Sequence, residues 1–273
     1  MSIETTDLDD DFLTLLLAEN DLSESIPKDA NLSKPFALTD IQRGYLLGRD
    51  PAMPLGGIAC QFYYELACND LNIDHYLRCW DSVIARHPMM RVAIDAETAS
   101  QLITAQHALE TVLHVMRGKT TAVAMASLYR IRRRLAGALP DPNPASHVLG
   151  IEFSLMPDGT CHIHLQFDLI ACDQQSILIL LCETAALYKN ENAALPVIST
   201  TFPSYLAKLH KYRADAREPA LTYWQSRVDD MPDAPALPYK SAPEEAGNTT
   251  FERFSAELEE KQWQALEKLA ASN

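Results

Sequence analysis

The sequence predicts an α/β sandwich, in which helices flank a mixed sheet. Segments rich in strand-forming residues alternate with segments whose apolar residues recur at helical spacing. The turn signal Pro157-Asp158-Gly159 lies between two strand-like segments and indicates a hairpin. Apolar residues make up 47% of the 273 residues and charged residues 22%, which is ordinary usage for a globular chain.

The first predicted elements lie in the first half of the chain. Residues 59–66 are rich in strand formers and follow a Gly-Gly turn signal. From residue 73, apolar side chains share one helical face as far as His87-Pro88, where the helix should end because the residue before a proline is pushed out of helical geometry. Residues 91–94 indicate a buried strand, the next stretch is ambiguous, and residues 121–135 predict a helix that carries four arginines.

The next group of predicted elements contains the hairpin. Residues 148–155 and 161–167 are its strands, and the second strand alternates apolar with polar side chains. After a loop at 168–173, residues 176–188 predict an apolar, buried helix. Residues 202–228 predict one or two helices, and a proline-rich stretch after them indicates an extended linker.

The composition excludes several classes of function. The formal net charge is −14, and an acidic chain repels phosphates, so we expect neither nucleic acid nor an anionic membrane as a partner. No apolar run approaches the ~20 residues that cross a bilayer, and the acidic N-terminal residues do not fit a signal peptide. The six cysteines are scattered without a CxxC pair, as is typical of reduced thiols. We therefore expect a soluble, cytoplasmic protein.

Two carboxylates, Asp168 and Asp173, stand five residues apart in the loop between the second hairpin strand and the next helix. Burial there should raise the pKa of a carboxyl unless a cation or amide donors keep it ionised. Such a pair could carry out acid/base chemistry or fix the geometry of the loop. From the residues alone the structural interpretation is favoured, with Asp173 capping the helix and Asp168 ending the strand.

This loop resembles the DxxxxDxxS signature of the heterocyclization (Cy) domains of nonribosomal peptide synthetases, with Asp168, Asp173 and Ser176 in the signature positions. Cy domains are relatives of the condensation domains, whose corresponding motif is HHxxxDG. The resemblance extends to further motifs in the expected order. They are FALTDIQRGYLLGR at residues 36–49 (similar to FPLTxxQxAYxxGR), RHPMMR at residues 86–91 (similar to RHPMLR), FPSY at residues 202–205, Tyr223-Trp224 and Leu237-Pro238.

The resemblance implies a chloramphenicol-acetyltransferase-like fold of two lobes with a tunnel between them. Two thioesters enter the tunnel on phosphopantetheine arms, carried by peptidyl or aryl carrier proteins and neighbouring synthetase domains. The family joins them through an amide and then cyclises a Cys, Ser or Thr side chain onto the new carbonyl, which expels water. The expected products are thiazoline or oxazoline rings, often in siderophores, and no directly bound cofactor is expected.

The resemblance also implies roles for individual residues. Asp168 and Asp173 are the predicted catalytic residues, and they shape the tunnel loop. Asp173 matches an aspartate that forms a structural salt bridge, and Arg91 is its expected partner because it closes RHPMMR. Leu169 stands where condensation domains keep their essential histidine, so we expect no histidine-based acyl transfer. The residues assigned to architecture and motif rather than chemistry are Gln42, Tyr45, Arg49, His87 and Ser176.

Two other clusters are weaker candidates. His162 and His164 share one strand face with Asp168, a spacing that could hold a metal, although a polar sheet face is the favoured interpretation. The basic cluster Arg130–Arg134 is favoured as a solvated helix face over a docking surface for an acidic carrier protein. The sequence has neither a GxSxG nucleophile elbow nor a phosphate-binding loop.

Three parts of the chain are expected. Residues 1–35 form a leader with a short leucine-rich helix, which either packs on its own domain or docks another chain. Residues 36–240 form the N-terminal lobe with a connecting segment, and residues 241–273 begin a truncated C-terminal lobe with a strand at 249–258 and a helix. The family's Thr and Asp that promote cyclodehydration would lie in that second lobe, supplied in cis or in trans, so this chain alone should be inactive. The alternative is a non-catalytic condensation-like module that binds carrier proteins or synthetase subunits.

Overall fold

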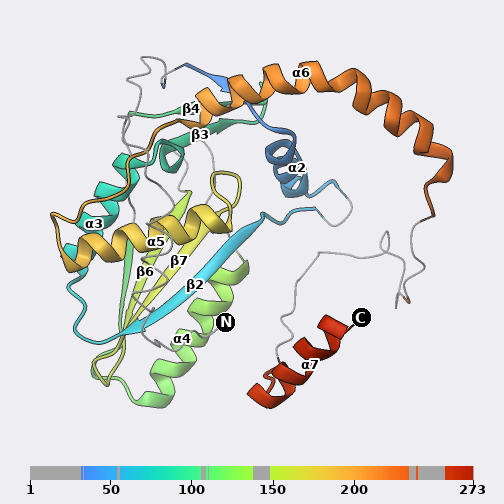
Figure 1. Ribbon diagram of the computed structural model, residues 1–273. Coiled ribbons are helices and arrows are strands. Elements are labelled where there is room, and N and C mark those ends of the chain that lie inside the picture. Colours follow the sequence, from blue (N-terminus) through green and yellow to red (C-terminus); the bar gives the residue numbers. More distant parts are fainter. Residues whose placement is uncertain are drawn as a thin grey trace.

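The fold is that of a computed structural model, shown in Figure 1. The structure describes residues 32, 34–53, 56–105, 109, 111–137, 148–233, 238 and 256–272. The predicted leader helix lies outside the described residues, as does most of the strand predicted at 249–258. Residues 256–258, the described end of that strand, are not in a strand.

The larger sheet is mixed, as predicted, with the strand order β2-β7-β6-β5. β7 pairs antiparallel with β2 and with β6, whereas β5 and β6 are parallel. Its strands are β2 (Gln61–Cys68), β5 (Thr111–Val115), β6 (Leu149–Leu155) and β7 (Cys161–Asp168). The predicted hairpin is confirmed, with Leu155 opposite Cys161, and Gly159 in its turn has a left-handed φ of 95° that a glycine adopts without strain.

A smaller antiparallel sheet has the order β1-β4-β3. Its strands are β1 (Phe36–Ala37), β3 (Val92–Asp95) and β4 (Ser100–Ile103). β3 confirms the strand predicted at 91–94. β4 and β5 both lie in the stretch that was ambiguous in the sequence, because strands of four and five residues show too few alternations to define a period.

Helices cover both faces of the larger sheet: α3 and α5 on one face and α4 on the other (Figure 1). The helices are α2 (Asp40–Arg49), α3 (Ile73–Arg86), α4 (Thr121–Gly137), α5 (Gln174–Lys189), α6 (Phe202–Arg227) and α7 (Glu260–Ser272). α3 ends before His87-Pro88, as predicted, and α6 is one continuous helix with Pro219 inside it. None of the helices in the described part of the chain is long and apolar enough to cross a membrane.

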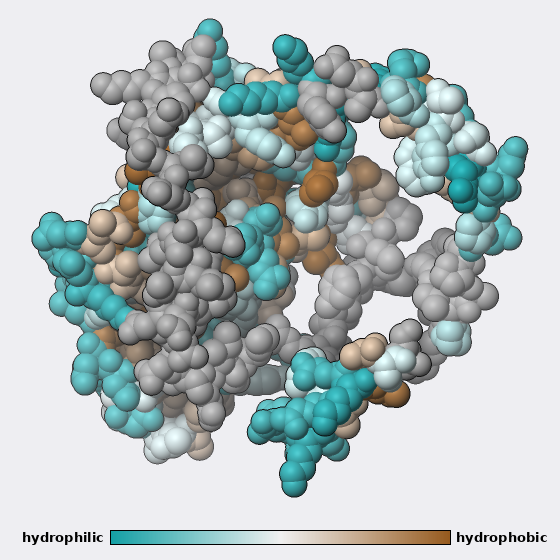
Figure 2. All heavy atoms as spheres, viewed as in Figure 1, coloured by the Kyte–Doolittle hydropathy of each residue, from teal (hydrophilic) through white to brown (hydrophobic). Residues whose placement is uncertain are grey.

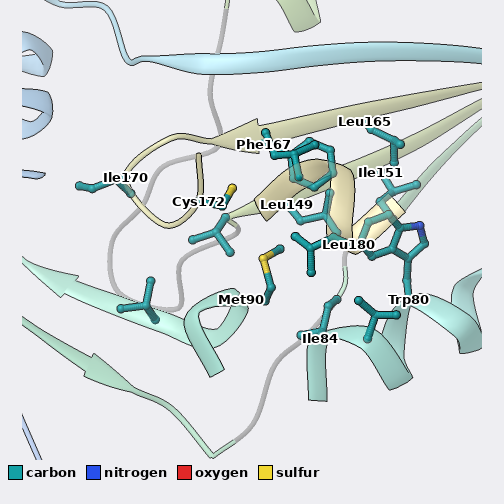
Figure 3. Close-up of a cluster of buried hydrophobic side chains, with 14 of the residues drawn as sticks. Trp80, Ile84, Met90, Leu149, Ile151, Leu165, Phe167, Ile170, Cys172 and Leu180 are labelled. Atoms are coloured by element: carbon teal, nitrogen blue, oxygen red, sulfur yellow. The ribbon is translucent and has the colours of Figure 1, made fainter. Parts of the chain in front are cut away.

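The hydrophobic core lies between the larger sheet and the α3–α5 layer (Figure 3). The side chain of Asn72 caps α3 by accepting the backbone N–H of His75 at 3.0 Å. The helical face that the sequence predicted then turns inward, so that Trp80 is 0% exposed. Trp80 packs against Phe167 of β7, with ring centroids 6.0 Å apart. The apolar face of β7 is therefore covered by α3 and α5, and this packing holds in place the strand that leads into the candidate site.

Candidate functional site

The site loop, residues 168–176, joins β7 to α5 and is anchored at its start by an ion pair. Asp168 is the last residue of β7 and is only 1% exposed. Arg49, the last residue of α2, places its Nη2 2.5 Å and 2.7 Å from the two carboxylate oxygens of Asp168. Only 14% of the Arg49 side chain is exposed, so both charges lie largely out of water. Helix α2 therefore holds the end of β7 through a buried ion pair.

A second contact from α2 fixes the middle of the site loop. The Nε2 of Gln42 donates to the backbone oxygen of Ile170 and to the side-chain oxygen of Gln101, each at 2.9 Å. The N–H of Ile170 donates in turn to the carboxylate of Asp168, also at 2.9 Å. Gln42 sits at the start of α2 in a capping box with Thr39, so its position is set by the helix start. Gln42 is therefore part of the scaffold of the loop.

The expectation that Arg91 pairs with Asp173 is wrong. The guanidinium of Arg91 donates to three backbone carbonyls, two of them in the last turn of α3, where carbonyls lack helical partners and a cation complements the helix dipole. The acceptors are Ile84, Ala85 and Thr104. The arginine that anchors the site loop is Arg49, and the aspartate that it holds is Asp168.

Asp173 caps α5, which confirms the structural interpretation of this residue. One of its carboxylate oxygens accepts the N–H of Ser176 at 2.8 Å and the hydroxyl of Ser176 at 2.7 Å. The Ser176 hydroxyl, and then its N–H, lower the pKa of the Asp173 carboxyl below its usual value, so this residue is a carboxylate near neutral pH. The two aspartates of the signature thus have different environments, one in a buried ion pair and one at a partly exposed helix cap.

We expect Asp173→Ala to lower the free energy of unfolding by about 1 kcal/mol, because α5 loses its N-cap. Soluble yield and ring formation by the full-length synthetase should fall with it. Asp173→Asn is the matched control, since asparagine caps a helix about as well as aspartate but carries no charge. Thermal unfolding separates the two: if the alanine and asparagine variants are equally unstable, capping is not the role of Asp173.

A cavity of about 620 Å³ opens beside the site loop. Leu169, Asp173 and Ser176 of the loop lie in its wall, together with Tyr45 of α2 and His87 from the turn after α3. The rest of the wall is mostly apolar and comes from the starts of α2 and α6, from α5, from the turn after α3 and from the segment before α6. Figure 2 shows hydrophobic side chains gathered around this part of the molecule.

Asp168 is not among the residues that line the cavity. Its carboxylate faces Arg49 and the backbone of the loop, so it supports the cavity wall from behind. Asp173, in contrast, contributes directly to the wall. The geometry therefore favours a positioning role for Asp168 and leaves Asp173 as the signature carboxylate that a bound molecule can reach.

The polar face of β7 forms a hydrogen-bonded network beneath α4. His164, 1% exposed, has Nδ1 2.7 Å from the hydroxyl of Tyr63 and Nε2 2.8 Å from the hydroxyl of Ser154. His162 has Nδ1 2.7 Å from a carboxylate oxygen of Glu65. Within the described ranges, no three His, Cys, Asp or Glu side chains are arranged to hold a metal. These two histidines thus belong to the interior of the sheet–helix layer.

The basic cluster on α4 is largely solvated, as the sequence suggested, but two of its arginines also form ion pairs. Arg132 forms an ion pair with Glu65 of β2, and Arg134 forms one with Glu152 of β6. Both carboxylates belong to the polar face of the sheet, so these arginines dock α4 onto it. Arg133 is exposed, as the sequence suggested.

Comparisons with known proteins show what the chain is similar to. No protein-family model matches the chain. Pyochelin synthetase PchF of Pseudomonas aeruginosa (strain UCBPP-PA14) is 32% identical over 235 residues, which are 85% of this chain and 13% of that protein. Phenyloxazoline synthase MbtB of Mycobacterium sp. (strain MCS) is 28% identical over 204 residues, 75% of this chain and 17% of that protein. The EpoB cyclization-docking bidomain from Sorangium cellulosum, in its monoclinic crystal form, matches with a TM-score of 0.77 and 25% identity over 96% of this chain and 53% of that one.

The match to a solved cyclization domain, together with the signature in the site loop, decides the family. The chain belongs to the Cy domain family of nonribosomal peptide synthetases. It is the N-terminal, chloramphenicol-acetyltransferase-like lobe of such a domain, and we call it the Cy lobe. The Cy lobe spans 13% and 17% of the two curated relatives and about half of the solved bidomain chain, so the activity of a whole synthetase is a proposal for it.

Sequence reasoning missed the partner of Asp168. Arg49 and Asp168 are 119 residues apart, and no local pattern records a contact at that separation. A signal did exist, because Arg49 ends the first family motif and Asp168 opens the site-loop signature, and an unpaired buried carboxylate requires a cation.

Proposed function

We propose that the Cy lobe forms one half of a channel in which a carrier-bound acyl thioester is condensed with a carrier-bound Cys, Ser or Thr thioester. The new amide is then cyclised and dehydrated to a thiazoline or oxazoline ring, in siderophore or related peptide biosynthesis. The substrates arrive on the phosphopantetheine arms of peptidyl or aryl carrier proteins, and the second lobe and neighbouring synthetase domains are the other partners.

The observation that carries this proposal is the position of the site loop beside the cavity. Two α2 side chains, Arg49 and Gln42, hold the loop so that its other face lines a largely apolar space. Such a space accommodates the apolar part of a tethered acyl group and excludes water, which would otherwise hydrolyse the thioester. The similar proteins include a pyochelin synthetase and a phenyloxazoline synthase, which supports ring formation of this kind.

The chemistry of the cavity wall favours direct transfer between the two tethers over an acyl-enzyme. Burial raises the pKa of the Cys172 thiol to about 12, so this wall residue stays protonated and is a poor nucleophile near neutral pH. Asp173 is engaged by Ser176 and serves better as a fixed negative charge than as a nucleophile. The role that remains for the lobe is to bring the amine and the thioester together and to handle protons.

The test is mass spectrometry of the products that form on loaded carrier proteins with the full synthetase that contains the Cy lobe. The proposal predicts an amide product and a second product that is lighter by one water. Carrier binding without either product would overturn it in favour of the non-catalytic condensation-like module.

A further inference from the structure

A buried carboxylate holds a histidine in the cavity wall. The Nε2 of His87 lies 2.7 Å from Oε2 of Glu183, a residue of α5 that is 5% exposed. The Nε of Arg86 donates to the same carboxylate oxygen at 3.0 Å, which provides a cation for the buried charge. The His87 side chain itself remains 21% exposed, and the residue lines the cavity together with Asp173 and Ser176.

This contact determines which nitrogen of the imidazole is available. A carboxylate accepts a hydrogen bond, so the neutral ring of His87 carries its proton on Nε2 and has its lone pair on Nδ1. Within the part of the chain that the structure describes, Nδ1 of His87 has no hydrogen-bond partner. A buried carboxylate on one nitrogen and a free lone pair on the other is the arrangement by which a histidine serves as a general base.

The other titratable side chains of the cavity wall are poorly suited to accept a proton near neutral pH. Carboxylates are weak bases, a guanidinium has no lone pair to offer, and phenols and thiols are acids, whereas a neutral imidazole accepts a proton on its free nitrogen. These other groups are Asp40 and Tyr45 of α2, Cys172 and Asp173 of the site loop, and Tyr205 and Arg213 of α6. Of the described wall residues, His87 is thus the one with the chemistry of a neutral-pH base.

We propose that His87 is the proton acceptor of the condensation step, with Glu183 as its positioning residue; this inference rests on the proposed function. Nδ1 of His87 takes a proton from the attacking amine as the C–N bond forms. The C–S bond of the thioester then breaks, and the same proton passes to the departing phosphopantetheine thiolate. The products are an amide and a free thiol, and Glu183 stabilises the imidazolium in between. His87 thereby supplies, from a different element, the imidazole that is absent at Leu169.

The experiment measures single-turnover condensation against pH, with loaded carrier proteins and the full synthetase. We expect His87→Gln to slow condensation by about 10²–10⁴-fold and to remove the acidic limb of the pH–rate profile. Added imidazole should restore part of the rate. We expect Glu183→Gln to keep the limb but to move it to lower pH, because the imidazolium loses its counter-ion.

The matched control is His210→Gln, a substitution of an exposed histidine on α6 that does not line the cavity. It should leave both rate and profile unchanged. A His87→Gln variant that keeps the wild-type rate and acidic limb would overturn the inference. A second combination would do the same: His87→Gln loses rate that imidazole does not restore, and Glu183→Gln shows an acidic limb at the wild-type pH. If instead the wild-type synthetase forms no amide, the proposed function itself fails, which is a distinguishable result.

Discussion

Arg49→Ala is expected to lower the free energy of unfolding of the Cy lobe by about 3–5 kcal/mol. The substitution leaves the carboxylate of Asp168 buried, at 1% exposure, without its cation. Removing one partner of a buried pair carries this cost because the remaining charge is neither solvated nor neutralised. Denaturant unfolding measures the change, and the site loop should lose its geometry, so condensation in the full synthetase should also fall.

Two further variants test whether the expected cost comes from leaving a buried charge without its partner. Arg227→Ala breaks an ion pair with Asp230 in which both side chains are more than half exposed, and it should cost no more than about 1 kcal/mol. The double variant Arg49→Met/Asp168→Leu removes both charges and should be more stable than Arg49→Ala alone. If Arg49→Ala costs no more than Arg227→Ala, the ion pair does not anchor the site loop.

The second large effect is a loss of stability in mild acid, caused by His164. Burial lowers the pKa of His164 to about 4 in the folded lobe, whereas an unfolded histidine titrates at about 6.5. The unfolded chain therefore binds a proton that the folded lobe does not, so acid favours unfolding. The contribution of His164 to the free energy of unfolding is fully present above about pH 6.5 and is lost as the pH falls toward 4. Between about pH 7.5 and about pH 5, the free energy of unfolding should fall by about 2 kcal/mol from this residue.

Chemical denaturation at a series of pH values checks this expectation. His164→Gln should flatten the dependence between about pH 7.5 and about pH 5, even though its overall stability is lower, and His210→Gln should leave the slope unchanged. Below that window, Glu65 adds a further loss: burial opposes its charge, but hydrogen bonds from Arg132 and His162 hold the pKa of its carboxyl below the ordinary value. An unchanged slope in His164→Gln would show that this histidine is not the acid-sensitive group.

Local features of the fold could be predicted from the sequence, and long-range contacts could not. The hairpin around Gly159 and the helix that ends before His87 follow from turn chemistry and from proline sterics, which act between neighbouring residues. The pairing of Asp173 was mispredicted because a family motif suggested Arg91 as its partner. The carboxylate of Asp173 instead caps α5 by accepting the N–H and the hydroxyl of Ser176, a contact between near neighbours in sequence.

The same distinction applies to the candidate site. The signature identified the site loop, but its surroundings depend on side chains from α2, from the turn after α3 and from α6, all far away in sequence. The histidine of the RHPMMR motif could be found as a motif position, yet its contact with Glu183 needs the packing of α3 on α5. Pattern reasoning thus finds the residues of a site more readily than the partners that set their chemistry.

The separation of Arg49 and Asp168 has a consequence for biosynthesis. A ribosome adds roughly 5–20 residues per second, so the 119 residues between these two take about 6–24 s to emerge. During that interval the residues of α2 lack the strand end that they will hold, and a helix of this length is marginal in water without such a partner. The cavity wall is therefore among the late-forming parts of the lobe, because most of its residues are translated only after residue 168.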